Sequence, residues 1–291
     1  MEPGQVFRYA SLSELNSLEV HLPKNPQHDH QPKFWVVYIH GGAWRDPATN
    51  SSSIQPSLSG LLPAAAWIEG VASLNYRLSG NPGSDDAAHN AIHPDHVEDV
   101  LTAICWLENK YRFGERYILV GHSAGATLAF QAVAGHWEAR DSSPDYPLSS
   151  FVKPLAVAGL AGIYDIQILL KSFSAIPLYR SFIEAAFGKD ETVWKRASPT
   201  HVDLSHWRNA RCVVLADSDE DKLIDTPQAD AMWSHLVSNE SEHRLDVRMK
   251  LRGDHDDMWN KGHELAKVIL HTLDLLKKFL REGSLPLSSD L

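Results

Sequence analysis

One serine, carried on a turn between a strand pattern and a helix pattern, constrains this chain more than any other feature. The turn is Gly121-His-Ser-Ala-Gly125. Before it, residues 117–120 are apolar and partly β-branched, as in a buried parallel strand. After it, residues 124–134 are rich in alanine and contain no proline, which favours a helix. The pattern predicts that Ser123 stands at the tip of a tight turn, where flanking glycines avoid clashes and a helix N-terminus favours negative charge.

The surroundings of this motif matter because the bare pattern is not rare. With glycine and serine each at about 7% of residues, Gly-x-Ser-x-Gly arises by chance in roughly one chain of this length in ten. The order of strand, turn and helix is the context in which such a serine acts as a nucleophile. We therefore interpret Ser123 as a candidate nucleophile.

Strand and helix patterns alternate along most of the chain. Residues 1–32 are polar, are broken by four prolines and give no strong strand signal. The alternation that follows predicts a mostly parallel, doubly wound central sheet flanked by helices. The predicted strands are 34–39, 70–76, 117–120, 154–162, 210–216 and 245–251. The predicted helices are 58–67, a long helix from Pro94 to just before Gly114, 124–134, 226–237 and 259–280.

The length of the chain suits a single α/β domain over residues 1–291. Hydrophobic residues make up 43% and charged residues 22%, a balance that can build a sizeable core. Residues 166–207 resemble short helices separated by Pro177, Gly188 and Pro199. This segment is predicted to form a small helical cap over the site.

A serine hydroxyl needs a base to take its proton, and the base needs a carboxylate to orient it. Both partners are expected downstream, in the order acid then histidine, each just past a strand. His255 follows the last predicted strand and is the candidate base. Asp221 is the preferred acid because Lys222-Leu-Ile then returns to apolar sequence, and Asp219 is the second choice. The carboxylates that compete for this role are Asp217, Asp219, Glu220, Asp221 and Asp225.

The loop His40-Gly41-Gly42-Ala43-Trp44 follows an early central strand. Backbone N–H groups in this position can stabilise an oxyanion together with the N–H after the nucleophile. The predicted donors are Gly42, Ala43 and Ala124. Trp44, beside this loop, is predicted to form a wall of the substrate pocket.

Three other histidines, His89, His93 and His96, are spaced four and three residues apart. Pro94 interrupts that helical turn, and neither a cysteine nor a carboxylate set completes a site. The sequence therefore predicts neither a metal nor a cofactor.

Charge and hydropathy limit the partners. A net charge of −10 without a long basic run argues against nucleic acid and anionic membranes. No run approaches the length of a membrane span, and the N-terminus lacks the pattern of a secretory signal. Cys105 and Cys212 lie in apolar stretches and are predicted to be buried free thiols, which fits a reducing compartment.

Three segments of the chain together resemble the fungal kynurenine formamidases. They are residues 40–47, 121–125 and 255–262. The resemblance extends from Trp35 to about Leu276. Its most specific part is His-Gly-Gly-x-Trp with the Asp-Pro that follows. Many related esterases carry a further glycine where this chain has Ala43, which favours the formamidases over esterases that resemble hormone-sensitive lipase.

The resemblance implies an α/β-hydrolase fold and hydrolysis of N-formyl-L-kynurenine, a step of tryptophan breakdown that can feed NAD synthesis. It assigns the nucleophile to Ser123, the acid to Asp221, the base to His255 and the oxyanion donors to Gly42 and Ala43. It also implies a cytoplasmic enzyme that needs no metal or cofactor and is often a homodimer. Two alternatives stay open: a small-acyl carboxylesterase of the same fold, and a non-catalytic binding protein, which would be expected to lack a triad member.

Overall fold

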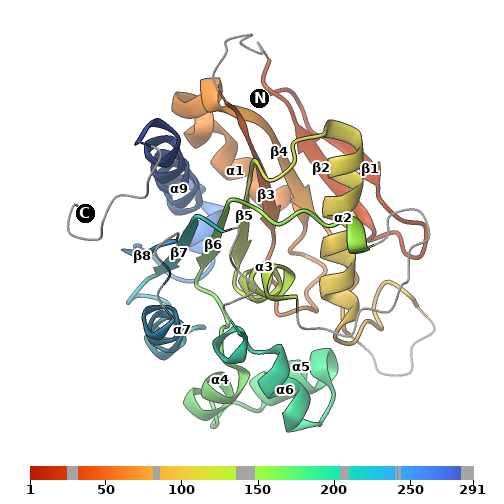
Figure 1. Ribbon diagram of the computed structural model, residues 1–291. Coiled ribbons are helices and arrows are strands. Elements are labelled where there is room, and N and C mark those ends of the chain that lie inside the picture. The colour runs from red at the N-terminus through yellow and green to blue at the C-terminus, as the bar shows by residue number, and fades with distance from the viewer. Residues whose placement is uncertain are drawn as a thin grey trace.

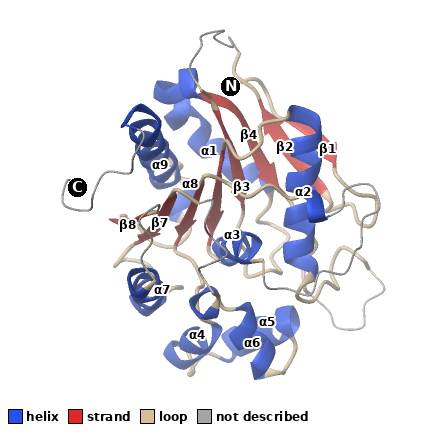
Figure 2. Ribbon diagram, in the orientation of Figure 1, coloured by secondary structure: helices blue, strands red, loops and turns tan. Residues whose placement is uncertain are grey.

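The structure is a computed structural model, and it describes residues 1–24, 32–80, 86–135, 148–203, 210–239, 241 and 244–282. Within these residues the chain forms an eight-stranded sheet with helices against both faces (Figure 1, Figure 2). From one edge to the other, the strand order is β1-β2-β4-β3-β5-β6-β7-β8. The strands are β1 (Gln5–Arg8), β2 (Ser17–His21), β3 (Phe34–Ile39), β4 (Ile68–Leu74), β5 (Tyr117–His122), β6 (Ala156–Leu160), β7 (Cys212–Asp217) and β8 (Leu245–Lys250).

The strands from β3 to β8 are parallel, whereas β1 and β2 join the sheet antiparallel. Every residue of β3, β5, β6 and β7 is buried. Because helices cover both faces of these strands, their sequences are continuous apolar runs rather than alternating ones. The predicted α/β fold with a mostly parallel sheet is confirmed.

The two N-terminal strands are absent from the sequence-based prediction. In β2, the polar residues Glu19 and His21 interrupt the apolar pattern, although the whole strand is buried. Their side chains lie against each other, with 3.3 Å between His21 Nε2 and Glu19 Oε1, and Gln55 Nε2 donates to Glu19 at 3.1 Å. These polar contacts form only in the folded protein. They allow a segment whose sequence resembles a loop to form a buried strand.

The helices form two layers around the sheet. α2, α3 and α7 pack on one face, and α1, α8 and α9 on the other, each layer with its own apolar core (Figure 1). The predicted helix 58–67 is instead a 3-10 helix over Ser59–Trp67, since Gly60 and Pro63 do not support regular α-helix there. The helices are α1 (Gln55–Leu58), α2 (Asp95–Tyr111), α3 (Ala124–Ala134), α7 (Thr226–Ser238), α8 (Asp257–Asn260) and α9 (His263–Glu282).

Three further helices lie together beyond one end of the sheet (Figure 1). They are α4 (Ile166–Ser172), α5 (Pro177–Phe187) and α6 (Glu191–Ala197), and a 3-10 turn at Pro199–His201 follows them. They occupy the segment predicted as a cap, whose last residues, 204–207, lie outside the described part of the chain. Tyr179 of α5 contacts the loop after β7, because its hydroxyl donates to Leu223 O at 2.7 Å.

Cys105 and Cys212 are both buried and are not joined by a disulfide, as predicted. None of the described helices is both long and apolar enough to cross a membrane.

Candidate active site

Ser123 occupies a sharp turn between β5 and α3. Its φ is 54° and its ψ −121°, a conformation in which a residue with a side chain is strained. A Cβ on Gly121 would collide with the backbone oxygen of Gly125, and one on Gly125 with that of Ile39. Glycine is therefore required on both sides of the serine, and Ser123 N is fixed by donating to Leu160 O at 2.9 Å.

His255 and Asp221 come from loops that follow neighbouring strands, β8 and β7. His255 Nδ1 donates to Asp221 Oδ2 at 2.7 Å. The other oxygen, Oδ1, accepts from the N–H groups of Leu223 and Ile224 at 2.8 and 2.9 Å. Since the Asp221 side chain is only 1% exposed, this carboxylate is buried and fully hydrogen-bonded.

The neighbouring carboxylates point elsewhere. Asp219 is 74% exposed at its side chain and pairs with Lys250 at 2.7 Å. Asp217 pairs with both Arg248 and Lys250, at 3.1 and 2.6 Å. Among the described residues, Asp221 is thus the carboxylate that contacts the His255 ring, in line with the preference for it over Asp219.

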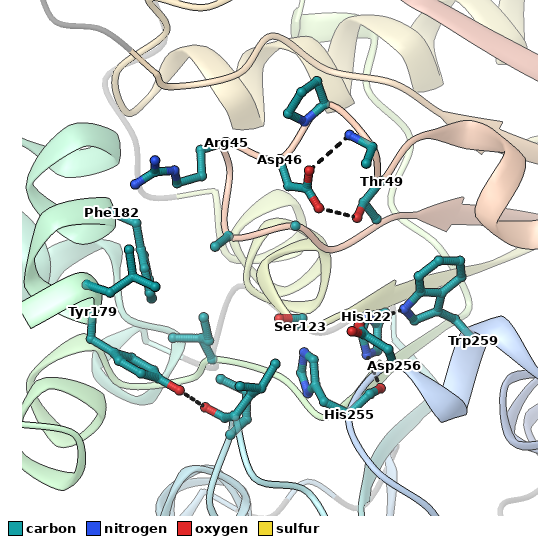
Figure 3. Close-up of a pocket in the computed structure, with 18 residues that line it drawn as sticks. Arg45, Asp46, Thr49, His122, Ser123, Tyr179, Phe182, His255, Asp256 and Trp259 are labelled. Atoms are coloured by element: carbon teal, nitrogen blue, oxygen red, sulfur yellow. Dashed lines mark hydrogen bonds between the residues drawn. The ribbon is translucent and has the colours of Figure 1, made fainter. Parts of the chain in front are cut away.

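The His255 ring faces Ser123 across the floor of a shared cavity (Figure 3). No hydrogen bond from the Ser123 hydroxyl is recorded among the described residues. Such bonds are often long in enzymes without substrate and shorten in the complex. The three side chains are therefore brought together in the order that proton transfer from serine to histidine requires.

The loop after β3 has three consecutive residues with positive φ: Gly42 at 90°, Ala43 at 48° and Trp44 at 58°. The Gly42 carbonyl is engaged within the loop, because it accepts from Arg45 N and Asp46 N, both at 2.9 Å. None of the hydrogen bonds among the described residues uses the N–H of Gly42, Ala43 or Ala124. A concave run of free N–H groups beside a nucleophile can bind an oxyanion.

Tyr76 and His40 hold this loop from below. The Tyr76 hydroxyl donates to the carbonyls of His40 and Gly41, at 3.1 and 2.9 Å, and its ring stacks on His40 with centroids 4.5 Å apart. Burial lowers the pKa of His40 to about 4, so its ring is neutral at pH 7. His40 therefore supports the loop, and its Nδ1 donates to Gly41 O at 2.9 Å.

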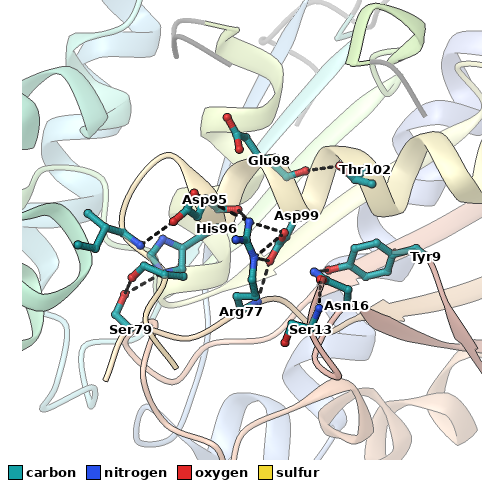
Figure 4. A network of polar contacts seen from close by, with 12 residues as sticks. Tyr9, Ser13, Asn16, Arg77, Ser79, Asp95, His96, Glu98, Asp99 and Thr102 are labelled. Carbon is teal, nitrogen blue, oxygen red and sulfur yellow. Dashed lines mark hydrogen bonds and ion pairs between the residues drawn. The ribbon is translucent and has the colours of Figure 1, made fainter. Parts of the chain in front are cut away.

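Tyr76 is fixed in turn by its chain neighbours, Asn75 and Arg77, and the contacts of Arg77 are drawn in Figure 4. Arg77 makes a two-pronged ion pair with Asp99 of α2, in which Nη2 lies 2.9 Å from Oδ1 and Nε 2.9 Å from Oδ2. The Arg77 N–H also donates to Asp99, at 2.8 Å, and Tyr9 OH donates to Asn75 O at 2.9 Å. The clamp on the oxyanion loop is thus anchored to a helix and to the N-terminal segment.

His122, the variable residue before the serine, has a role that sequence reasoning missed. It is buried, and burial holds its pKa well below the usual range. Its Nε2 donates to His255 O at 3.2 Å, and the two rings lie 4.6 Å apart. A neutral His122 therefore fixes the backbone of His255, and only its position between two glycines could have drawn attention to it.

The cavity has a volume of about 680 Å³ and is mainly apolar on the side of α5 (Figure 3). Its aromatic lining comes from α5 and α8. The lining residues are Gly42, Ala43, Arg45, Asp46, Pro47, Ala48, Thr49, His122, Ser123, Ile163, Leu178, Tyr179, Phe182, Leu223, Ile224, His255, Asp256 and Trp259.

Trp44 is not part of this lining, which corrects the prediction that it forms a pocket wall. Its side chain is fully buried and meets Phe187 edge to face, with centroids 4.9 Å apart. The left-handed backbone turns the indole into the core beneath α5. Tyr179 and Phe182, three residues apart on one helical face, supply the aromatic wall instead, and this spacing in the sequence was the available signal.

The histidines considered for a metal have separate surroundings. His96 Nε2 lies 2.8 Å from Ser79 Oγ, and His89 Nδ1 lies 2.8 Å from Asp86 Oδ2. His93 packs against Phe187, with centroids 5.4 Å apart. Among the described residues, no group of three histidine, cysteine or acidic side chains could hold a metal ion.

Comparison with known proteins gives matches over nearly the whole chain. Residues 18–236 match the model of the BD-FAE family. A kynurenine formamidase-like hydrolase of Fusarium equiseti is 35% identical over 91% of each chain. A kynurenine formamidase of Aspergillus versicolor is 39% identical over 80% of this chain and 86% of its own length.

Solved structures of esterases share the fold. Esterase B from Lactobacillus rhamnosis superimposes with a TM-score of 0.69 at 16% identity, covering 97% of this chain and 90% of its own. A thermophilic esterase from Thermogutta terrifontis gives 0.63 at 18% identity, covering 97% and 94%. At such identities the similarity shows the architecture alone.

Proposed function

The chain belongs to the kynurenine formamidase family of α/β-hydrolases, and on that basis we propose that it hydrolyses N-formyl-L-kynurenine to L-kynurenine and formate through a Ser123-His255-Asp221 triad. The observation that carries the proposal is the buried Asp221–His255 pair facing Ser123 in one cavity with the free N–H groups of Gly42 and Ala43. Each part has a defined task in acyl transfer to a serine.

In the first step, Ser123 Oγ attacks the formyl carbon while His255 Nε2 takes the hydroxyl proton. The carbonyl oxygen becomes an oxyanion, which accepts hydrogen bonds from the N–H groups of Gly42, Ala43 and Ala124. The C–N bond then breaks, and His255 gives its proton to the aryl amine, which leaves as kynurenine. Asp221 keeps the Nδ1 proton oriented and stabilises the imidazolium between these transfers.

In the second step, a water molecule replaces the amine. His255 takes a proton from the water as its oxygen attacks the formyl-serine carbon, and the same N–H groups hold the second oxyanion. The ester bond breaks, Ser123 recovers its proton from His255, and formate leaves. The overall reaction consumes one water and needs no electron transfer.

The cavity fits an aryl leaving group. Tyr179 and Phe182 line one side and Trp259 another, so a flat aromatic amine can lie against a ring. A small-acyl carboxylesterase is the second candidate, because the same triad cleaves esters and the solved neighbours are esterases. A non-catalytic binding protein is disfavoured, since every member of a triad is present.

Steady-state kinetics distinguishes these candidates. We expect kcat/KM to be highest for N-formylkynurenine and lower for its N-acetyl analogue, because an added methylene is worth about 1–3 kcal/mol in a pocket and a tight acyl site penalises it at least as much. p-Nitrophenyl acetate should be turned over and the octanoate should not. A preference for octanoate, with no turnover of N-formylkynurenine, would assign the protein to the lipid esterases.

The remaining expectations belong to the same proposal. Cleavage of N-formylkynurenine would give the protein a step in tryptophan breakdown. We further propose that residues 1–291 act as one domain, with the helices of segment 166–207 as its cap. Cytoplasmic location and homodimerisation stay predictions.

A further inference from the structure

The cavity contains one strong cation. Arg45 is the only lysine or arginine among its described lining residues, and it is exposed. It lies two residues after Ala43, in the same loop that carries the free N–H groups. Leu178 and Phe182 of α5 give the lining an apolar part, and Asp46 and Thr49 of the Arg45 loop give it a polar part.

Arg45 has no ion-pair partner among the described residues. The acid nearest to it in the chain, Asp46, is engaged: its Oδ1 accepts from Ala48 N at 3.0 Å and its Oδ2 from Thr49 Oγ1 at 2.9 Å. The backbone of Arg45 is fixed, because its N–H donates to Gly42 O at 2.9 Å. A guanidinium without a protein carboxylate, carried on a loop whose backbone is held in place, can bind a carboxylate from a ligand by two parallel hydrogen bonds.

The acidic side chains make the cavity electrostatically asymmetric. Asp256 lies on the other side of Ser123 from Arg45 (Figure 3), and its Oδ1 accepts from Trp259 Nε1 at 3.1 Å. A ligand carboxylate would be repelled by Asp256 and attracted by Arg45, whereas the other acidic lining residue, Asp46, has both carboxylate oxygens occupied by donors of its own loop. The asymmetry therefore selects one direction for a substrate that carries an anionic group at one end and the scissile amide at the other.

We propose that Arg45 is a specificity-determining residue that binds a carboxylate on the leaving group of the substrate. The substrate class is then formylated aryl amines with an amino-acid or other carboxylate side arm, and this inference rests on the proposed function. Because Arg45 and the oxyanion donors share one rigid loop, binding of the carboxylate aligns the formyl group with Ser123.

The test compares two amides that differ only in the side arm. N-formyl-L-kynurenine carries the carboxylate, and 2-formamidoacetophenone keeps the aryl ketone without it. For Arg45→Gln we expect kcat/KM on N-formylkynurenine to fall by about 10- to 100-fold, mainly through KM, since a charge-assisted pair is lost. On 2-formamidoacetophenone the change should stay within about twofold, and Arg45→Lys should restore part of the loss.

Arg180→Gln is the matched control. Arg180 lies on α5, outside the cavity lining, and its side chain is 56% exposed and paired with Glu184. This variant removes the same charge from a helix that lines the cavity and should leave kcat/KM for both substrates unchanged. If Arg45→Gln lowers kcat/KM equally for both substrates, or for neither, Arg45 does not bind the carboxylate.

A binding readout separates this inference from the proposed function. L-Kynurenine and 2-aminoacetophenone are used as inhibitors of p-nitrophenyl acetate hydrolysis. Arg45→Gln should weaken inhibition by kynurenine by about 10-fold or more and leave that by 2-aminoacetophenone unchanged. A wild type that cleaves neither amide contradicts the proposed function, and Arg45 is then judged on inhibition alone: equal inhibition of wild type and variant by kynurenine overturns its role.

Discussion

At the scale of single residues, the site depends on groups whose surroundings leave them one role. Asp221 is buried and accepts three hydrogen bonds, whereas Asp219, two residues earlier, is exposed and paired with a lysine. A buried carboxylate held by two backbone N–H groups cannot rotate away from the imidazole. The two side chains are chemically identical, and they differ only in where the fold places them.

The two aspartates can be separated by matched substitutions. We expect Asp221→Asn to lower kcat by about a hundredfold or more, because the amide cannot hold His255 in the required tautomer. Asp219→Asn should cost less than about twofold. Both are measured with N-formylkynurenine and with p-nitrophenyl acetate, after circular dichroism has shown that each variant is folded. The reverse ranking would identify Asp219 as the acid.

The nucleophile is tested by removal and by labelling. Ser123→Ala should stay folded and lose activity by about three or more orders of magnitude, because triad members act as a unit. A serine-directed organophosphate should label the wild type at Ser123, as seen by peptide mass spectrometry, and should not label the variant. Activity retained in folded Ser123→Ala would reject the mechanism.

At the scale of elements, helix α5, in the segment proposed as the cap, contacts the turn that carries Asp221. The Tyr179 hydroxyl donates to Leu223 O, and the N–H of Leu223 donates to Asp221 Oδ1. The Tyr179 ring is stacked on Phe173, with centroids 4.3 Å apart and planes at 3°. One residue of the cap thereby supports both the cavity wall and the turn that carries the acid.

This link predicts the effect of deleting one oxygen. Tyr179→Phe keeps the ring and its stacking but removes the bond to Leu223, so the Asp221 turn gains freedom. We expect kcat to fall by about 3- to 10-fold with little change in KM, given roughly 1 kcal/mol for such a bond. Tyr111→Phe, at the C-terminal end of α2 and outside the cavity lining, serves as control. A KM effect with unchanged kcat would mean that the hydroxyl contacts substrate instead.

At the scale of the whole molecule, several buried histidines tie stability to pH. Burial lowers the pKa of His40 and His93 to about 4 and that of His96 to about 3. In the unfolded chain they titrate near 6.5. Between these values the unfolded chain binds protons that the folded chain does not, so the free energy of unfolding falls as pH drops below about 6.5. Above that pH their contribution is constant.

One of these histidines can be removed without loss of a known bond. His93 Nδ1 has no partner among the described residues, so His93→Leu should fold and lose one titrating group. Between pH 6 and pH 4.5 we expect a shallower decline in the free energy of unfolding, by up to about 1.4 kcal/mol per pH unit. Urea denaturation at several pH values measures the slope. His89→Gln is the control, and a wild-type slope in His93→Leu would show that His93 does not contribute.

Local patterns in the sequence determined the central strands, the helices α2, α3, α7 and α9, and the turn that carries Ser123. They could do so because these features depend on neighbours in the chain: apolar runs buried on both faces, helical periodicity, and glycines where a Cβ would meet backbone. The chain order of Ser123, Asp221 and His255, the proposed nucleophile, acid and base, was likewise available from the sequence, since each follows a strand.

Only the tertiary structure decided which acid meets His255, that Trp44 is buried, and that Arg45 faces the cavity. It also revealed that β2 completes the sheet, although its polar residues conceal it in the sequence. Each of these facts depends on the distance between segments far apart in the chain. Residue type and spacing do not encode such distances, because they arise only when packing and hydrogen bonding fix every segment at once.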